Sequence, residues 1–277
     1  MSGFFVALFI LVAAMAPLIA PYSYETQDLN RVLLGPNWIN WFGTDSLGRD
    51  LFSRVLYGAR VSLSVGLVTS LAALIVGTFY GAVAGYFGGW VESLLMRAAD
   101  TIQSFPHMVL MILVAAIFSS FSFIEDRQTR SVVGIILALS LSGWVNLARL
   151  VRNHVLQIKT MPYIEAGFAA GAPPLRMIVR HIIPNLAGPL LVMFTHLIPN
   201  QILYESFLSF VGLGLQPPFS SWGVLVNEGW KTFRSYPHLI LLPGLSMFVT
   251  MLALQFFGDS LRDRLDPKSS YGTLPET

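Results

Sequence analysis

The chain has 277 residues, of which 54% are hydrophobic and only 12% are charged, and its mean hydropathy is +0.64. An average soluble domain carries about 25% charged residues, so this composition excludes an ordinary soluble enzyme and a disordered chain. The absence of cysteine excludes disulfide scaffolds, thiol catalysis and cysteine-based zinc sites. The net charge of +2 comes without a basic run, so nucleic acid is not an expected partner. The class that remains is an all-α polytopic membrane protein that forms one bundle in the lipid bilayer.

Six segments are predicted to be transmembrane helices, because about 20 mostly apolar residues cross roughly 30 Å of hydrocarbon. They cover residues 3–20, 61–87, 105–124, 131–151, 186–211 and 237–257. A cleaved signal peptide is the alternative for the first segment, but no Lys or Arg precedes Arg31, so a retained anchor is favoured. Lysines and arginines are almost evenly divided between the two sides of these spans, so charge alone does not set the orientation.

A polar stretch at residues 21–60 separates the first two spans. Asp45 and Arg49 stand four residues apart, as do Asp50 and Arg54, and this spacing favours charge pairs on a helix. Apolar residues at 51, 52, 55, 56 and 59 fall on one side of the same helix. The pattern predicts a short amphipathic helix at the membrane surface, either as an anchor for the next span or as a functional surface.

The second span carries Gly77, Gly81 and Gly85 at four-residue spacing. Such a stripe lets the backbone of another helix approach closely. It predicts helix packing inside a bundle and says nothing about activity.

The fifth span contains prolines and polar residues among its apolar ones, which is expensive in hydrocarbon unless the polar groups face protein or water. The pattern predicts a bent helix that lines a cavity, with His196, Asn200 and Glu205 as candidate residues of a translocation path. At about 100° per residue, His196 and Asn200 project roughly 40° apart, whereas Glu205 projects to the opposite side. An interhelical hydrogen bond or an interfacial position is the alternative for Glu205.

The loop at residues 152–185 carries four basic residues and one acid, Glu165. Pro162 can begin a helix and Gly171 can end one, and a second short helix is predicted at residues 175–183, before Pro184. A helix–turn–helix loop of this length predicts a docking surface for a soluble partner. Because the loop joins two spans, it can transmit a displacement from that partner to both of them.

No phosphate-binding loop and no His-Glu-x-x-His motif occur in the sequence, so nucleotide hydrolysis and a zinc protease are not predicted. The histidines are scattered without ligand spacing, and we predict neither a catalytic residue nor a metal site. The alternatives outside transport complexes are an intramembrane enzyme, which would need a catalytic cluster, and a stand-alone secondary transporter, which would need an internal repeat. The sequence shows neither feature.

The loop resembles a known family. Glu165-Ala166-Gly167, followed by Gly171 and Pro184 at the expected distances, is similar to the EAA motif of ABC-importer permeases. Gly167 stands where the motif has a second alanine, His181 where it has isoleucine and Ile183 where it has leucine. The spacing of the motif is kept, and Gly167 is as small a residue as the alanine it replaces. These departures therefore leave the predicted docking role in place.

Three further stretches resemble the "C"-type permeases of the dipeptide/oligopeptide/nickel family. They are residues 42–50 (FGTDSLGRD), residues 208–223, which include LSFVGLG and SWG, and residues 258–267 (GDSLRDRLDP). The chain departs from that family at its N-terminus, where the resemblance implies a longer basic cytoplasmic segment.

The resemblance implies a type I ABC importer permease fold in the inner membrane of a bacterium or archaeon. It divides the chain into a first transmembrane helix at 1–20, an extracytoplasmic loop at 21–60, a five-helix core at 61–258 and a cytoplasmic tail at 259–277. Both termini are then cytoplasmic. The implied partners are a sister permease, two ABC ATPase subunits that bind ATP and Mg, and an extracytoplasmic solute-binding protein, and this chain binds no cofactor.

The coupling residues implied by the resemblance are Tyr163, Glu165, Ala166, Gly167, Gly171 and Pro184. An alternative role for Glu165 is a pair with an arginine of its own loop. The run at 203–210 looks closest to oligopeptide permeases, so peptides are the expected substrate. A nickel chelate, glutathione and an oligosaccharide are the alternatives within the family.

Overall fold

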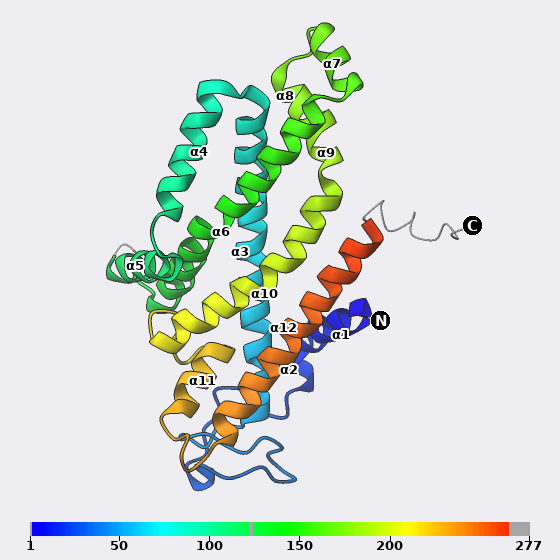
Figure 1. The fold of residues 1–277 in the computed structure, drawn as a ribbon. Coiled ribbons are helices and arrows are strands. Elements are labelled where there is room, and N and C mark those ends of the chain that lie inside the picture. Colours follow the sequence, from blue (N-terminus) through cyan, green and yellow to red (C-terminus); the bar gives the residue numbers. More distant parts are fainter. Residues whose placement is uncertain (1, 122–123, 266–277) are drawn as a thin grey trace, which may run out of the picture.

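The computed structural model describes residues 2–121 and 124–265, and these residues form helices and loops without a β-strand. The helices make one elongated bundle around α3 (Leu51–Phe87), which runs along most of the long axis (Figure 1). At about 1.5 Å per residue, the 37 residues of α3 extend roughly 55 Å, so this helix is longer than the hydrocarbon layer is thick. The all-α prediction is confirmed.

By length and apolarity, three helices can each cross a membrane alone. They are α3, α6 (Arg127–Lys159) and α12 (His238–Leu265). Two bent pairs qualify if each pair is counted as one span, which brings the described residues to at most five spans. The pairs are α4 (Gly89–Gln103) with α5 (His107–Ser120), bent by 83°, and residues 174–185 with α10 (Ala187–Val211), bent by 68°.

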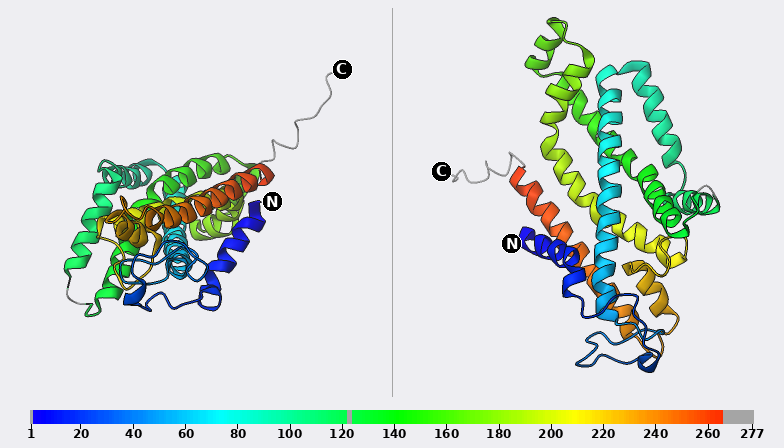
Figure 2. Two further views of the ribbon diagram at one scale, coloured as in Figure 1. Left: turned by 90° about the horizontal axis from the view of Figure 1, so that it is seen from below. Right: turned by 180° about the vertical axis from the view of Figure 1, so that it is seen from behind.

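The predicted first span at 3–20 is divided into α1 (Ser2–Ala14) and α2 (Ala16–Ile19). Pro17 lies in the first turn of α2 and has no backbone N–H, so a continuous helix would lose a hydrogen bond there. The 13 residues of α1 extend only about 20 Å. This helix lies beside α12 and ends halfway along the bundle (Figures 1 and 2).

The predicted surface helix within residues 21–60 is wrong as a separate element. Residues 51–60 are the first turns of α3, which begins at Leu51 because the Asp50 side chain accepts a hydrogen bond from the Ser53 amide. Before Asp50 the chain forms a loop that contains only the short 3₁₀ helix η1 (Leu29–Arg31).

The predicted third span at 105–124 is only partly right, because its one helix, α5, has only 14 residues and qualifies as a span only together with α4, which precedes it. Pro106 lies between α4 and the 14-residue α5. Helix α4 was not predicted, since its residues were assigned to the loop before the third span. Its charged side chains pair with α6: Arg152 binds Glu92 through Nε at 2.7 Å, and Arg149 binds Asp100 through Nη2 at 2.5 Å. These ion pairs allow a charged helix to pack beside the apolar ones.

Helix α6 runs beyond its predicted end at residue 151 to Lys159, so the predicted loop at 152–185 starts eight residues later, at Thr160. No helix-breaking residue occurs before Pro162, which explains the extension. Asp126 caps the other end of α6. Hydrogen bonds from the Thr129 hydroxyl and amide lower the pKa of the Asp126 carboxyl, so this cap is charged at neutral pH.

Gly77, Gly81 and Gly85 lie against the backbone of α6. A methyl group on Gly77 would reach the Trp144 carbonyl oxygen at 2.8 Å, and one on Gly81 would overlap the carbonyl oxygen of Ala148. The glycine stripe therefore sets the close contact between α3 and α6.

The remaining elements complete the two ends of the bundle. They are α7 (Pro162–Ala169), α8 (Pro174–Met177), the π-helical turn η2 (Ile178–Ile182), α9 (Ile183–Asn185) and α11 (Trp222–Trp230). Helices α7–α9 lie at one end and α11 lies toward the other, beside the loop at 21–50 (Figure 1). Helix α12 continues to Leu265, so the predicted tail at 259–277 begins as helix, and its residues 266–277 lie outside the described part of the chain.

Candidate functional site

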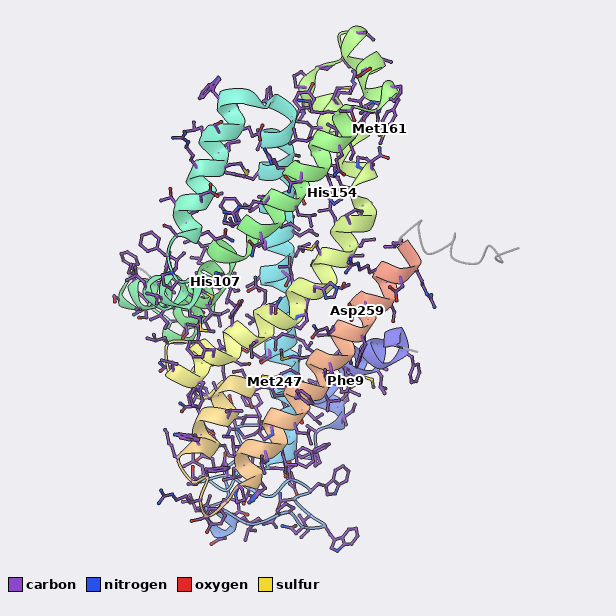
Figure 3. All side chains as sticks on the ribbon, viewed as in Figure 1. Phe9, His107, His154, Met161, Met247 and Asp259 are labelled. Carbon is purple, nitrogen blue, oxygen red and sulfur yellow. The ribbon has the colours of Figure 1, made fainter. Side chains whose placement is uncertain are left out.

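Residues 160–185, the α7–α9 loop, form the helix–turn–helix that the sequence predicts. Pro162 begins α7, Gly171 takes a φ of +72° after it, and Pro174 lies in the first turn of α8. Helix α7 stands at the extreme end of the molecule, beyond the turn that joins α3 to α4 (Figure 1), and Met161 lies where the loop starts (Figure 3). The loop connects α6 to α10 directly.

The predicted coupling residues lie mostly on the open side of this loop. Tyr163 is 48% exposed, and Glu165, Ala166, Gly171 and Pro184 are exposed, whereas Gly167 is half-buried. Within the described residues no ion pair involves Glu165, so the alternative that it binds an arginine of its own loop has no support. A free carboxylate among exposed apolar side chains fits a surface that a partner covers.

The inner side of the loop is fixed by apolar packing. Ile164 is 0% exposed and packs into a cluster of buried residues from α3, α6, α8, η2 and α10. The cluster includes Tyr86, Val151, Met177, Ile182 and Leu190. The Lys159 ammonium donates a hydrogen bond to the Tyr86 carbonyl oxygen at 2.8 Å, near the C-terminus of α3. The loop is therefore attached to the bundle on one face and open on the other.

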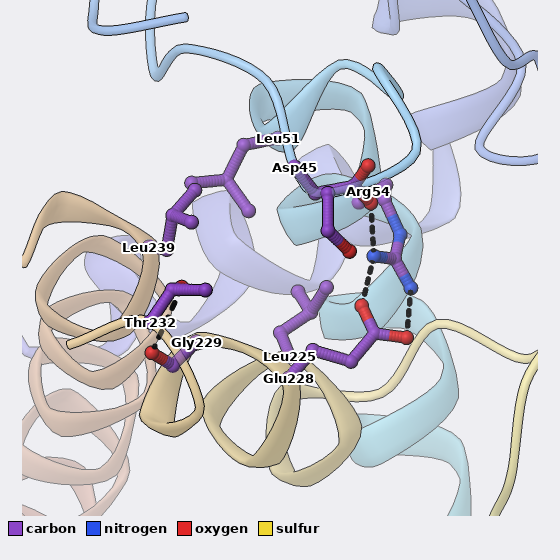
Figure 4. Close-up of a pocket in the computed structure, with 9 residues that line it drawn as sticks. Asp45, Leu51, Arg54, Leu225, Glu228, Gly229, Thr232 and Leu239 are labelled. Carbon is purple, nitrogen blue, oxygen red and sulfur yellow. Dashed lines mark hydrogen bonds and ion pairs between the residues drawn. The ribbon is translucent and has the colours of Figure 1, made fainter. Parts of the chain in front are cut away.

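A charge cluster of Asp45, Arg49, Arg54 and Glu228 holds the opposite end together. The Asp45 carboxylate accepts hydrogen bonds from Arg49 Nε and Arg54 Nη1, each at 2.6 Å. Glu228, on α11, binds both arginines, and Figure 4 shows Arg54 between Asp45 and Glu228. Arg54 is 0% exposed, and the Asp45 and Arg49 side chains are also buried. The cluster ties the loop before α3 to α3 itself and to α11.

The sequence identified the motif of this cluster but not its contacts. Asp45 and Arg49 pair as their spacing predicts, although they lie in a loop. Asp50 and Arg54 do not pair: Asp50 caps α3 and accepts a hydrogen bond from Asn40 Nδ2 at 2.9 Å, while Arg54 turns to Asp45 and Glu228. Glu228 was missed because it lies more than 170 residues away, and no local pattern links it to Arg54.

The three predicted path residues lie in three different surroundings. His196 faces Asp259 on α12, with Nε2 at 3.6 Å from Oδ1. Glu205 is 0% exposed and accepts hydrogen bonds from the hydroxyls of Ser62 and Ser209, each at 2.8 Å. It connects α10 to α3 as the interhelical alternative predicts. Asn200 is exposed and borders a hollow.

This hollow, of about 350 Å³, lies between α4, α5, α6 and α10. Its polar side chains carry mainly amides, and we call it the amide hollow. They are Gln103, His107, Asn146, Asn200, Gln201 and Tyr204. His107 stands at the start of α5 (Figure 3), and its ring contacts that of Tyr204 at a centroid distance of 4.8 Å. Of these residues, only Asn200 was identified from the sequence as a path candidate.

Among the described residues, no group of three or more His, Cys, Asp or Glu side chains could hold a metal ion.

Comparisons with known proteins agree with this architecture. The family model of the binding-protein-dependent transport system inner membrane component matches residues 77–271. The model of the N-terminal TM domain of oligopeptide transport permease C matches residues 1–36. Together these two models reach both ends of the described chain.

Three curated relatives match nearly the whole chain. The dipeptide transport system permease protein DppC of Bacillus subtilis is 41% identical over 97% of this chain and 81% of its own length. The oligopeptide transport system permease protein OppC of Bacillus subtilis is 36% identical over 95% and 83%. The glutathione transport system permease protein GsiD of Pectobacterium atrosepticum is 38% identical over 96% and 86%.

A solved structure supports the fold. An inward-facing conformation of the MetNI methionine ABC transporter matches with a TM-score of 0.63 and 16% sequence identity, over 77% of this chain and 96% of that chain. The predicted importer-permease fold is confirmed. One family model covers well over half of the sequence and three relatives exceed 30% identity over most of their length, so the chain belongs to the binding-protein-dependent transport system inner membrane components, the permeases of ABC importers.

Proposed function

We propose that this permease carries peptides and forms one half of a translocation path whose other half is a sister permease. The support for peptides is that the three relatives are named for a dipeptide, an oligopeptide and glutathione, which share amide-linked main chains. The solute-binding protein delivers substrate at the end that carries the charge cluster. Both termini and the α7–α9 loop face the cytoplasm of a bacterial or archaeal cell.

The proposed coupling step rests on one observation: α7 is attached to the bundle by one face and is exposed on the other. Its buried face, centred on Ile164, is fixed to the bundle, while its exposed face presents Tyr163, Glu165 and Ala166. Two ATPase subunits bind ATP and Mg, one on each permease, and they hold the exposed face. When ATP closes the ATPase pair, α7 is displaced, and α6 and α10 move with it because the loop joins them. This motion alternates access between the two sides of the membrane.

Glu165 gives a direct test of this coupling. In the complete complex, reconstituted in proteoliposomes with its binding protein, Glu165→Ala is expected to lower ATP-driven uptake of trialanine about tenfold or more. A charged group that loses its partner in an interface commonly costs that much affinity. The matched control is Glu125→Ala, which removes an exposed glutamate just before α6, far from the α7–α9 loop.

Both variants are expected to purify with the sister permease and the ATPases, because neither side chain is buried. Normal uptake by Glu165→Ala would overturn the role of α7. Equal losses in both variants would show a general effect of removing acidic side chains and would also contradict it.

A further inference from the structure

The amide hollow has a composition that matches a peptide main chain. Four of its six polar side chains are carboxamides: Gln103, Asn146, Asn200 and Gln201. A carboxamide carries both a hydrogen-bond donor and an acceptor, as does each peptide unit of a substrate. We propose that this hollow is the surface along which a translocated peptide slides, with its main-chain amides bound to these side chains. The inference rests on the proposed function.

The position of the hollow requires water or protein beside it. Asn146 lies near the middle of α6, and Asn200 lies near the middle of α10. Both side chains are exposed on the isolated chain. Amides at the centre of a membrane-crossing bundle do not face lipid, because their hydrogen-bonding groups would be unsatisfied there. The hollow therefore opens toward the sister subunit and the path between the two permeases.

One side chain in the hollow has an unused hydrogen-bonding group. Gln201 is only 2% exposed, and its Oε1 has no hydrogen-bond partner among the described residues. Its side chain lies against Gly143 of α6, where a methyl group would overlap it. Buried polar atoms are nearly always paired, so this carbonyl oxygen is a ready acceptor for a main-chain N–H that enters the hollow.

The other amides are held in place by their neighbours. Gln103 Nε2 donates a hydrogen bond to Asn146 Oδ1, which joins α4 to α6 across the hollow. Asn200 Nδ2 donates to the His196 carbonyl oxygen at 3.1 Å. The side chains are thus oriented before substrate arrives, which reduces the entropy lost on binding.

The lining also explains tolerance of substrate sequence. It contains no Asp, Glu, Lys or Arg, and its apolar part comes from residues such as Phe105, Leu110 and Leu197. A charged substrate side chain finds no fixed opposite charge there, whereas every peptide offers the same main-chain groups. Selection among peptides is then left to other parts of the importer.

The absence of cysteine from this chain makes a precise test possible. Asn200→Cys places one thiol in the hollow, and Leu245→Cys places one on the exposed apolar face of α12 as the control. The complete complex in proteoliposomes is treated with a membrane-impermeant maleimide, and labelling is read on this subunit after gel separation. Trialanine uptake by each variant is measured in parallel.

We expect Asn200→Cys to react and Leu245→Cys to stay unlabelled, since the thiol reagent needs water. During turnover, saturating trialanine with the binding protein is expected to slow labelling of Asn200→Cys several-fold. Labelling of both variants at equal rates, or of neither, would overturn the inference. Labelling that trialanine does not slow, in a complex that takes up trialanine, would overturn this inference alone. Absence of uptake by the unmodified complex would overturn the proposed function and this inference together.

A second pair of variants tests the hydrogen bond itself. Gln201→Leu removes the unused acceptor while keeping a similar volume, and is expected to lower trialanine uptake about tenfold, the effect of one lost hydrogen bond. Gln157→Leu, near the far end of α6, is the matched control and is expected to leave uptake unchanged. Equal uptake by both variants would contradict the role of Gln201.

Discussion

At one end of the bundle the charged side chains of Asp45, Arg49 and Arg54 are buried and paired with one another and with Glu228, whereas at the other end Glu165 is exposed. The first arrangement fixes three segments relative to one another, because separating a buried charge from its partner costs much free energy. The second leaves hydrogen-bonding capacity for another molecule. The contrast supports the proposal that contacts within this chain fix the charge-cluster end, whereas the α7–α9 loop keeps an open face for a partner.

The largest expected effect comes from breaking the charge cluster. Arg54→Met leaves Asp45 and Glu228 without one of their partners, and is expected to lower the free energy of unfolding by about 3–5 kcal/mol. The control is Arg31→Met, whose pair with Asp28 is exposed, with side chains 41% and 39% accessible. Such a pair contributes at most about 1 kcal/mol.

Thermal unfolding of the purified complex in detergent, followed by tryptophan fluorescence, measures both variants. A fall in midpoint for Arg54→Met that is no larger than for Arg31→Met would show that the cluster does not hold this end together.

The next effect compares two glycines that have nearly the same φ and lie at opposite ends of the bundle. Gly48 has a φ of +71° and Gly171 a φ of +72°, a region in which a side chain costs about 1–2 kcal/mol. At Gly48 a methyl group would also overlap the carbonyl oxygen of Asp28, whereas at Gly171 no atom lies within 4 Å. Gly48→Ala is therefore expected to lower the free energy of unfolding by more than about 2 kcal/mol, and Gly171→Ala by about 1 kcal/mol.

The same unfolding measurement decides this comparison, since the conformational strain is shared and only the surroundings differ. Equal destabilisation by the two variants would mean that the loop before α3 accommodates a methyl group as easily as the α7–α9 loop does. The two ends would then not differ in how tightly they are packed.

The parts of the molecule that were predictable are those fixed by local residues. Pro162 and Gly171 act through their own backbone restrictions, so the first short helix of the α7–α9 loop and the turn after it were predicted close to their observed positions. The long apolar helices were found for the same reason, since about 20 consecutive apolar residues are a local property. Contrary to the prediction, Pro184 does not end the second helical stretch, because it lies in the first turn of α9, and the stretch continues to Asn185.

The parts that were missed depend on residues far apart in the sequence. Helix α4 has the charges of a loop, and the partners of its Asp100 and Glu92, Arg149 and Arg152, follow 49 and 60 residues later on α6. The amide hollow combines side chains of four elements, and its amides come from α4, α6 and α10, so no single stretch of sequence contains more than two of them. The resemblance to a family predicted the importer-permease function and a coupling role for the α7–α9 loop, but not the contacts that hold either end.

The smallest expected effect lies in the α7–α9 loop and separates adjustable packing from fixed packing. A methyl group on Gly167 would approach Met177 Cε to 2.8 Å, but this is the flexible end of a side chain and can move. Alanine is also favoured over glycine in a helix by about 0.5–1 kcal/mol, so Gly167→Ala is expected to change the free energy of unfolding by less than about 1 kcal/mol. Gly81→Ala is the contrast, because there the methyl group would meet the backbone of α6 at Ala148, which cannot turn away; overpacking of this kind costs about 1–3 kcal/mol. If chemical unfolding gave equal losses for the two variants, the loop would be as tightly packed as the seam between α3 and α6, and a partner could not reshape it on binding.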